Sequence, residues 1–286
     1  MATVTAGKGN TGRGGFKFHF EHVAWSVLGI LLILALWEIA AAYLKSVNPY
    51  AERLFPSWTT ILTRSWQELA VFASPGEPNV GPAAAVGVII RASLTTASEV
   101  AAGTTIGLVA GFAIGLLLCY SSTFALILGP LVSVMRPFPL LALLSLFTIW
   151  FGGEAIGILL FVAFASFVMT VVASFHAALN TPPIMTAFAQ TLGANRRQLF
   201  QTVVIPSMLP ELFGTLRNVA ALSWSFALGG EYTGAQGGLG FLLYYADKFA
   251  FLGRLVVIVA LFSIFAVIID ALLMLVRRWI IRWAPV

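Results

Sequence analysis

The side chains that most often perform catalysis are few in this sequence, and their spacing does not build a reaction centre. Ser174 and His176 could serve as nucleophile and base, but they lie two residues apart in an apolar run. In a helix that separation directs the two side chains to different faces. A metal site needs convergent ligands, and neither His19 with His22 nor the single Cys119 has a ligand cluster beside it. The sequence therefore predicts no catalytic and no metal site in this chain.

The glycine-rich stretch GAQGGLG, residues 234–240, invites comparison with nucleotide-binding motifs. A phosphate-binding P-loop requires GxxxxGK[ST], and neither Lys nor Ser follows these glycines. A Rossmann fingerprint requires a preceding strand, which this context does not predict. We therefore expect no cofactor in this chain.

Four carboxylates inside apolar runs, Glu38, Glu99, Glu231 and Asp270, are the other polar groups with functional potential. Ion-coupled transport is expected to bury several ionisable groups in mid-span, so four scattered acids support it weakly. Glu99 lies near the edge of an apolar run, where a carboxylate should face protein or water. It is a candidate for lining a path or for a structural contact.

The elements that must position these residues are membrane helices. The chain is 59% hydrophobic and 9% charged, with a mean hydropathy of +0.95, whereas about a quarter of the residues of soluble domains are charged. The net charge of +5 comes from basic residues that flank apolar runs instead of forming one stripe, which indicates membrane topology and not nucleic-acid binding. We predict an all-α polytopic protein of the lipid bilayer, with no nucleic-acid partner.

The apolar runs predict about six transmembrane helices. They contain residues 25–44, 95–120, 126–151, 156–178, 212–227 and 255–276. Residues 1–22 are expected to form a flexible cytoplasmic tail, residues 23–94 the first span with an amphipathic helix at the outer interface, and residues 95–283 the membrane core. Six spans place both termini in the cytoplasm, and most Lys and Arg residues fall in the segments that this topology places inside.

Gly103, Gly107, Gly111 and Gly115 recur every four residues in the second apolar run. They share one helix face, which lets another backbone approach closely. Two interpretations remain open: packing within one subunit, or an interface between subunits.

Residues 181–217 form the longest polar interval between apolar runs. Met185, Phe188 and Leu192 have the spacing of a short amphipathic helix, and Gly193 predicts a break that leaves no room for a bulky side chain. After the break come Arg196 and Arg197, the apolar residues Leu199, Phe200, Val203 and Val204, and Pro206 and Pro210, which are expected to stop the helix. The interval predicts a cytoplasmic loop of two helical turns in an L shape.

This loop resembles the "EAA" loop of the inner-membrane permeases of ABC importers. In that family, Gly is followed after nine residues by a hydrophobic-x-hydrophobic-Pro ending, and here Gly193 leads to Val203, Ile205 and Pro206. A second stretch, MRPFPLLALLSLFTIWFG, resembles the R-P-x-P-x-x-A…W-F-G signature of the subgroup importing sulfonates, taurine and nitrate. The matching residues are Arg136, Pro137, Pro139, Ala142, Trp150, Phe151 and Gly152, while Ser145 replaces a frequent Pro. Glu231 with Gly238 and Gly240 resembles the family's "A-E…G-L-G" stretch, where the helix yields to a flexible outer turn.

The resemblance implies a type I ABC importer permease fold and a non-enzymatic transport subunit of the inner membrane. Its implied partners are a second permease copy, ATPase subunits that hold ATP-Mg, and an extracytoplasmic solute-binding protein. The implied ATPase-coupling residues are Ala187, Phe188, Ala189, Leu192, Gly193, Ala194, Arg196, Arg197, Leu199, Phe200 and Pro206. The implied candidates for the translocation path or its gate are Glu99, Arg136, Pro137, Pro139, Glu231, Gly238 and Gly240.

This chain departs from the family pattern at the head of the loop, where Ala187 replaces Glu and Phe188 replaces Ala. We expect docking to rest on apolar contact, with Phe188 as the anchor. Arg196 and Arg197 either add polar contacts or only mark the inner side.

Three functions remain open from the sequence: an ABC permease for a small anion or vitamin precursor, an ion-coupled secondary transporter, and a non-transporting membrane scaffold. An ATPase that co-purifies with the chain would favour the first, and uptake driven by an ion gradient would favour the second.

Overall fold

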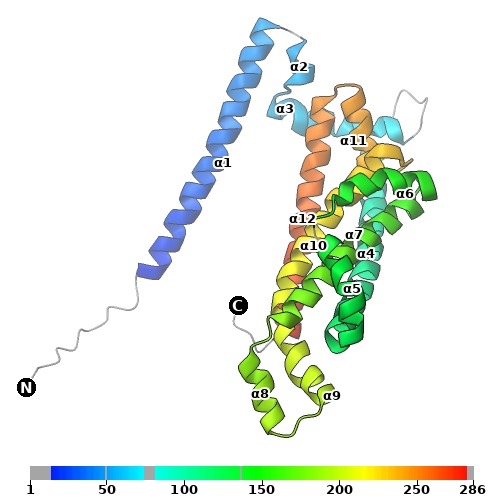
Figure 1. The fold of residues 1–286 in the computed structure, drawn as a ribbon. Coiled ribbons are helices and arrows are strands. Elements are labelled where there is room, and N and C mark those ends of the chain that lie inside the picture. Colours follow the sequence, from blue (N-terminus) through cyan, green and yellow to red (C-terminus); the bar gives the residue numbers. More distant parts are fainter. Residues whose placement is uncertain (1–13, 49, 74–80, 136, 282–286) are drawn as a thin grey trace, which may run out of the picture.

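The computed structural model describes residues 14–48, 50–73, 81–135 and 137–281; helices joined by short turns make up these residues, and no strand occurs within them. The long helices are α1 (Gly14–Val47), α4 (Pro82–Tyr120), α5 (Ser122–Met135), α7 (Ala155–Leu179), α10 (Ile205–Gly234) and α12 (Leu252–Ile280) (Figure 1). The short ones are α2 (Ala51–Leu54), α3 (Trp58–Thr60), α6 (Leu144–Phe151), α8 (Pro183–Thr191), α9 (Arg196–Leu199) and α11 (Leu239–Lys248). Single turns of other helix types are η1 (Ile61–Ser65), η2 (Gln67–Phe72), η3 (Leu140–Leu143) and η4 (Phe200–Val204).

Five helical segments are long and apolar enough to cross a membrane. They are Trp25–Val47, Pro82–Tyr120, Ala155–Leu179, Arg196–Gly234 and Leu252–Trp279. A sixth span results if Ser122–Met135 and Leu140–Phe151, which are bent by 92°, cross as one broken unit. The predicted all-α fold with about six spans is confirmed.

The first span begins at Trp25, as predicted, but the helix that contains it begins earlier. Helix α1 starts at Gly14, so residues 14–22 of the predicted tail are helical. The glycines end at Gly15, and the next Gly or Pro is Gly29, so nothing between them interrupts the helix. The rest of the predicted tail, residues 1–13, lies outside the described residues.

Helices α4, α7 and α10 build the centre of the bundle. Helix α4 packs most extensively on α7, which packs in turn on α10. Their shared core contains Val100 from α4, Phe161 and Val162 from α7, and Trp224 and Ala227 from α10. These interlocked apolar side chains fix the positions of the polar groups between the helices.

The bundle has two ends that differ in structure. The loop end carries α8 and α9, together with the last residues of α4 and α7 (Figure 1). The far end carries α11, the start of α12, and the short helices that follow α1 (Figure 1). Helix α1 begins, and α12 ends, on the side of the loop end (Figure 1).

The predicted amphipathic helix after the first span is a series of short turns at the far end. These turns hold α1: the indole N–H of Trp37 donates to the carbonyl of Pro56 (3.0 Å), and the Glu38 carboxylate accepts from the backbone N–H of Trp58 (2.9 Å). The rings of Trp37 and Phe55 stack with centroids 4.2 Å apart. Pro56 lies between α2 and α3, and from Trp58 to Phe72 the chain continues as α3, η1 and η2, so the predicted helix is present as successive α, π and 3-10 segments.

Prolines break the helices at other places than the sequence predicted. Pro206 and Pro210 do not stop the helix, because both lie within α10. Pro206 occupies the first turn of α10, where a missing N–H costs little, and the π turn η4 directly precedes it. The break at Pro137 and Pro139 does not lie near the loop end, since all of α5 separates it from that end.

Candidate functional site

Helix α8 presents an exposed apolar face at the loop end. Ile184, Phe188 and Leu192 recur every four residues, so they share one face, and they are 77%, 66% and 73% exposed. Met185 is half exposed beside them. The predicted amphipathic helix is therefore present, with its apolar face turned away from the bundle. Exposed apolar side chains gathered in this way indicate a contact surface.

Gly193 ends α8 in a left-handed conformation, with φ of +81°. The predicted break at Gly193 is confirmed, but its physical reason differs, because nothing lies within 4 Å of a Cβ built there. The backbone conformation, and not a lack of space, favours glycine. The next turn, α9, is fixed by a reciprocal cap: the Asn195 side chain accepts from the backbone of Gln198, whose side chain accepts from the backbone of Asn195.

The two arginines of the loop have different surroundings. The Arg196 guanidinium donates to the carbonyl of Tyr120 at the end of α4 and lies 5.2 Å from the centroid of the Tyr120 ring. The Tyr120 ring in turn meets Phe200 edge-on at 5.3 Å. Arg197 is exposed, and its side chain has no hydrogen bond or ion pair among the described residues. Arg196 therefore joins α9 to α4, and Arg197 is available to a partner.

Polar contacts tie the base of the loop to two spans. The Asn180 amide, at the end of α7, donates to both Glu211 oxygens at 3.0 and 3.2 Å. The hydroxyls of Thr181 and Ser207 lie 3.0 Å apart. The first contact joins the end of α7 to α10, and the second joins the chain just before α8 to α10.

The other predicted coupling residues lie either on the exposed surface of the loop or in the part that supports this surface. Ala187 is exposed next to Phe188, whereas Ala189 and Ala194 are half buried and joined by a 3.1 Å backbone hydrogen bond. Leu199 and Pro206 are half buried between the loop and α10. Ala187 and Phe188 thus belong to the exposed surface, and the other alanines to its support.

The glycine face of α4 packs against α7 of the same chain. A Cβ built at Gly103, Gly107, Gly111 or Gly115 would lie closer than 3.0 Å to atoms of α7. Each such contact includes either a carbonyl oxygen or a Cβ of α7, which a small rotamer change cannot move away. Of the two interpretations left open by the sequence, packing within one subunit describes this face. We call it the glycine seam.

Glu231 closes the turn between α10 and α11. It is 1% exposed and accepts from the Thr96 hydroxyl and from the Gly240 backbone N–H, both at 2.6 Å. The Leu239 N–H donates to the Thr96 hydroxyl at 2.9 Å, so the N–H groups of the first two residues of α11 are both satisfied. Gly238 has φ of +89°. The helix gives way to a turn here, as expected, and the two ends of the turn, Glu231 and residues 238–240, are buried and hydrogen-bonded; we call this arrangement the Glu231 junction.

The other path candidates lie in different places. Glu99 is 5% exposed beside Glu231, and one of its oxygens has no hydrogen-bond partner. Pro137 and Pro139 are exposed between α5 and η3. Arg136 lies outside the described residues. The structure thus gathers Glu99, Glu231, Gly238 and Gly240 and leaves the prolines apart.

An ion pair that the sequence did not single out joins α10 to α12. Two nitrogens of Arg217 contact the two carboxylate oxygens of Asp270 at 2.5 and 2.6 Å. The pair borders a pocket of about 310 Å³, which is also lined by Asn218 and Trp224. The Trp224 indole nitrogen is buried without a hydrogen-bond partner. The two charges stand 53 residues apart in sequence, so only the packing of α10 on α12 reveals the pair.

The candidate nucleophile and base do not pair. Ser174 is fully buried against Gly115, whereas His176 is exposed. Within the part of the chain that the structure describes, no three His, Cys, Asp or Glu side chains are grouped closely enough to hold a metal ion.

This architecture matches that of a known protein family. Residues 103–284 match the model of the binding-protein-dependent transport system inner membrane component. The matched region contains the glycine seam, the ion pair, the whole loop and, of the Glu231 junction, Glu231, Gly238 and Gly240 but not Thr96. The chain belongs to this family. The resemblance inferred from the loop and the R-P-x-P stretch is confirmed.

Relatives in this family include permeases with different named solutes. The taurine permease TauC of Escherichia coli is 32% identical over 174 residues, which are 60% of this chain and 63% of that protein. The putative aliphatic sulfonates permease SsuC of Bacillus subtilis is 24% identical over 64% of this chain and 66% of its own length. The chain thus spans slightly less than two thirds of both. The riboflavin permease RibX of Chloroflexus aurantiacus is 26% identical and covers 92% of both chains.

Solved structures of ABC importers share the fold. The inward-facing MetNI methionine ABC transporter has a chain that superposes with a TM-score of 0.56, at 17% identity, over 69% of this chain and 96% of that one. An amino acid ABC transporter gives a TM-score of 0.58 at 18% identity, over 68% of this chain and 95% of that one. The fold is that of a type I ABC importer permease in a multi-pass membrane protein.

Proposed function

We propose that this chain is the permease subunit of an ATP-driven importer of a small solute, and that residues 181–217 dock a separate ATPase subunit. The observation that carries the proposal is the exposed apolar face of α8, formed by Ile184, Phe188 and Leu192 beyond the ends of the spans. A lipid-facing role does not explain this face, because the loop is capped, charged and tied to the spans by polar contacts. Phe188 is the central anchor of the docking surface.

The base of the loop couples docking to the spans. ATP-Mg binds in the ATPase subunits, whose closure moves α8; this chain hydrolyses nothing. The contacts of Asn180 with Glu211 and of Thr181 with Ser207 carry the movement into α7 and α10. Arg196 carries it to the end of α4 through Tyr120. Three spans of the central bundle thus respond to one docking event.

The translocation path runs along the face that α10 and α12 share. Arg217 and Asp270 lie there with their side chains 39% and 46% exposed. Charges at membrane depth are costly when they face lipid, so this face turns toward a second permease copy and the water between the two. The Glu231 junction, with Glu99, Gly238 and Gly240, gates the path by holding α11 on α4 and α10. The broken segment around Pro137 and Pro139 supplies a second hinge.

The complete importer contains further subunits. A second copy of this chain packs against α1, whose described side chains are mostly apolar and exposed except near its far end. An extracytoplasmic solute-binding protein docks on the far end. This arrangement places α8, α9 and both termini in the cytoplasm of an inner-membrane protein. Taurine, sulfonate and riboflavin appear in the names of relatives, and the solute here is a small anion or a vitamin precursor selected mainly by the binding protein.

The test is recovery of an ATPase by the tagged chain after co-expression with the candidate ATPase subunit, in wild type and in Phe188→Asp. The substitution puts a charge at the centre of the apolar face, and we expect the bound ATPase to fall by at least about tenfold while the chain stays in the membrane. Gln190→Asp is the matched control, because position 190 is exposed on the same helix but faces another direction. Equal ATPase recovery by both variants, or ATP-independent uptake driven by an ion gradient, would overturn the proposal.

A further inference from the structure

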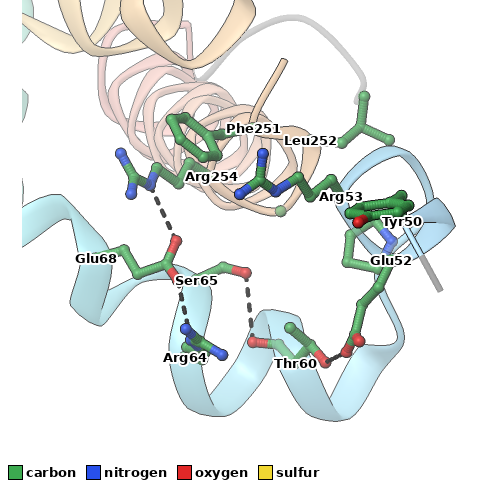
Figure 2. Close-up of a pocket in the computed structure, with 12 residues that line it drawn as sticks. Tyr50, Glu52, Arg53, Thr60, Arg64, Ser65, Glu68, Phe251, Leu252 and Arg254 are labelled. Atoms are coloured by element: carbon green, nitrogen blue, oxygen red, sulfur yellow. Dashed lines mark hydrogen bonds and ion pairs between the residues drawn. The ribbon is translucent and has the colours of Figure 1, made fainter. Parts of the chain in front are cut away.

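A polar pocket lies at the far end of the molecule, where the solute-binding protein is proposed to dock, and it has no assigned ligand. It lies between the turns from Tyr50 to Glu68 and the first turn of α12 (Figure 2). Its volume is about 340 Å³, which is within the size range of small-ligand sites. It is separated from the loop end by the length of α12 (Figure 1).

Two arginines of the pocket share one carboxylate. The Glu68 carboxylate accepts from Arg64 and from Arg254, each at 3.1 Å. The Arg254 side chain is only 15% exposed, and its guanidinium lies 4.1 Å from the centroid of the Phe251 ring. Stacking and the ion pair fix this guanidinium, yet one carboxylate does not neutralise two cations.

A third arginine has no counter-charge. Arg53 reaches from α2 across the pocket toward Phe251 (Figure 2), and its side chain has no hydrogen bond or ion pair among the described residues. The nearby acid Glu52 is already engaged, by Lys45 at 3.1 Å and by the Thr60 hydroxyl at 3.0 Å. Those two hydrogen bonds lower the pKa of Glu52, so it stays ionised and paired with Lys45. The lining therefore carries an excess of positive charge.

The backbone adds to the positive potential. Leu252, Gly253 and Arg254 form the first turn of α12, which has no side-chain cap, so the N–H groups of a 29-residue helix begin at the pocket. A Cβ at Gly253 would collide with the buried Ser65 side chain, so this turn fits closely against η1. The arginines are thus held around one space by packed elements.

We propose that this pocket binds an oxyanion group, a carboxylate, sulfonate or phosphate, between Arg53 and Arg254 at the start of α12. The group belongs either to a free solute or to the headgroup of an anionic lipid, since both offer the same oxygens. Its negative charge pairs with Arg53 and balances the excess around Glu68. The proposal stands independently of ATPase docking and of the transported solute.

The experiment is a titration of the purified full chain in phosphatidylcholine nanodiscs with sodium sulfate, at constant ionic strength set with chloride, read as the shift of the thermal unfolding midpoint. In parallel, the midpoint is measured in nanodiscs containing phosphatidylglycerol. Arg53→Gln is the main variant, because Arg53 is exposed and unpaired and its loss should leave the fold intact. Arg91→Gln is the matched control: it removes the same charge from an exposed residue of α4 that does not line the pocket.

We expect sulfate to raise the midpoint of the wild type and of Arg91→Gln, and its apparent dissociation constant to increase about tenfold in Arg53→Gln. A rise with phosphatidylglycerol alone that Arg53→Gln abolishes also supports the site and assigns it to a lipid headgroup. No effect of either probe on the wild type would overturn the proposal. So would equal responses of Arg53→Gln and Arg91→Gln.

Discussion

Glycine serves opposite purposes in the glycine seam and in the coupling loop. At Gly111 in the seam, a Cβ would lie 2.7 Å from the carbonyl oxygen of Phe167, so any side chain displaces a neighbouring helix. At Gly193 in the loop, the space is empty and only the positive φ of 81° favours glycine. In the seam, the lack of space excludes residues larger than glycine, whereas in the loop the backbone conformation favours glycine.

This difference separates the rigid part of the molecule from its contact surface. In the seam, α4 and α7 approach so closely that they move as one unit, since packed interfaces shift between discrete arrangements and do not deform gradually. In the loop, Gly193 sets the angle between α8 and α9 without any tertiary contact of its own. Substitutions at the two sites should therefore fail in different ways.

The largest effect is expected from Gly111→Leu. The new side chain must enter the backbone of α7, so the loss of unfolding free energy should exceed about 3 kcal/mol. We would measure monodisperse yield and resistance to unfolding in mixed micelles with sodium dodecyl sulfate. Gly87→Leu is the matched control in the same helix, because nothing lies within 4 Å of a Cβ there. Wild-type stability in Gly111→Leu would show that α4 and α7 can separate.

The seam was predictable only in part. The four-residue repeat of glycines in α4 predicts a close helix contact, because spacing alone places them on one face. It cannot name the partner, which depends on how α7 folds back along α4. The same holds for Arg217 and Asp270, whose charges stand in different spans. The loop was predicted more fully, since Gly193 and the spacing of Phe188 and Leu192 act locally.

In the glycine seam, atoms of α7 fill the space beside the glycines. Glu231→Ala tests whether the Glu231 side chain fills the space beside Gly238 and Gly240 in the same way. Removing the carboxylate leaves the Gly240 N–H and the Thr96 hydroxyl without their acceptor, which should cost about 2–3 kcal/mol. The measurement is the same micellar unfolding, with Glu154→Ala as a control at an exposed acid near the start of α7. In Glu231→Ala, the added substitution Gly238→Ala should cost less than in the wild type, because the atoms that lie nearest to a Cβ at Gly238 are the carboxylate atoms of Glu231, which the alanine lacks. Equal costs in both backgrounds would mean that the junction is not filled by Glu231.

Gly193→Val probes the loop. A β-branched residue at positive φ costs about 1–2 kcal/mol, so the angle between α8 and α9 should relax without global unfolding. We expect faster cleavage of residues 183–199 by a low concentration of trypsin, with an unchanged unfolding midpoint of the bundle. Gly193→Asn is the control, because Asn tolerates the left-handed conformation. If the valine and asparagine variants were cleaved at the same rate, the backbone conformation would not be what sets the loop angle.

The smallest effect is expected from substitutions of the two loop arginines, which should change hydrogen exchange in α9 differently. Arg196→Gln removes the hydrogen bond and the ring contact to Tyr120, which should loosen α9 by about 0.5–1 kcal/mol and raise its hydrogen-exchange rate a few-fold. Arg197→Gln removes an equal charge with no internal contact, so exchange in α9 should stay at the wild-type rate. Tyr120→Leu removes the ring contact but keeps the backbone carbonyl that accepts from Arg196, so its effect through Arg196 should be smaller than that of Arg196→Gln. The double variant should show less than the sum of the two single effects, because the ring contact is lost in both. Additive effects would show that Arg196 does not stabilise the loop through the Tyr120 ring, and would weaken the link between the loop and α4.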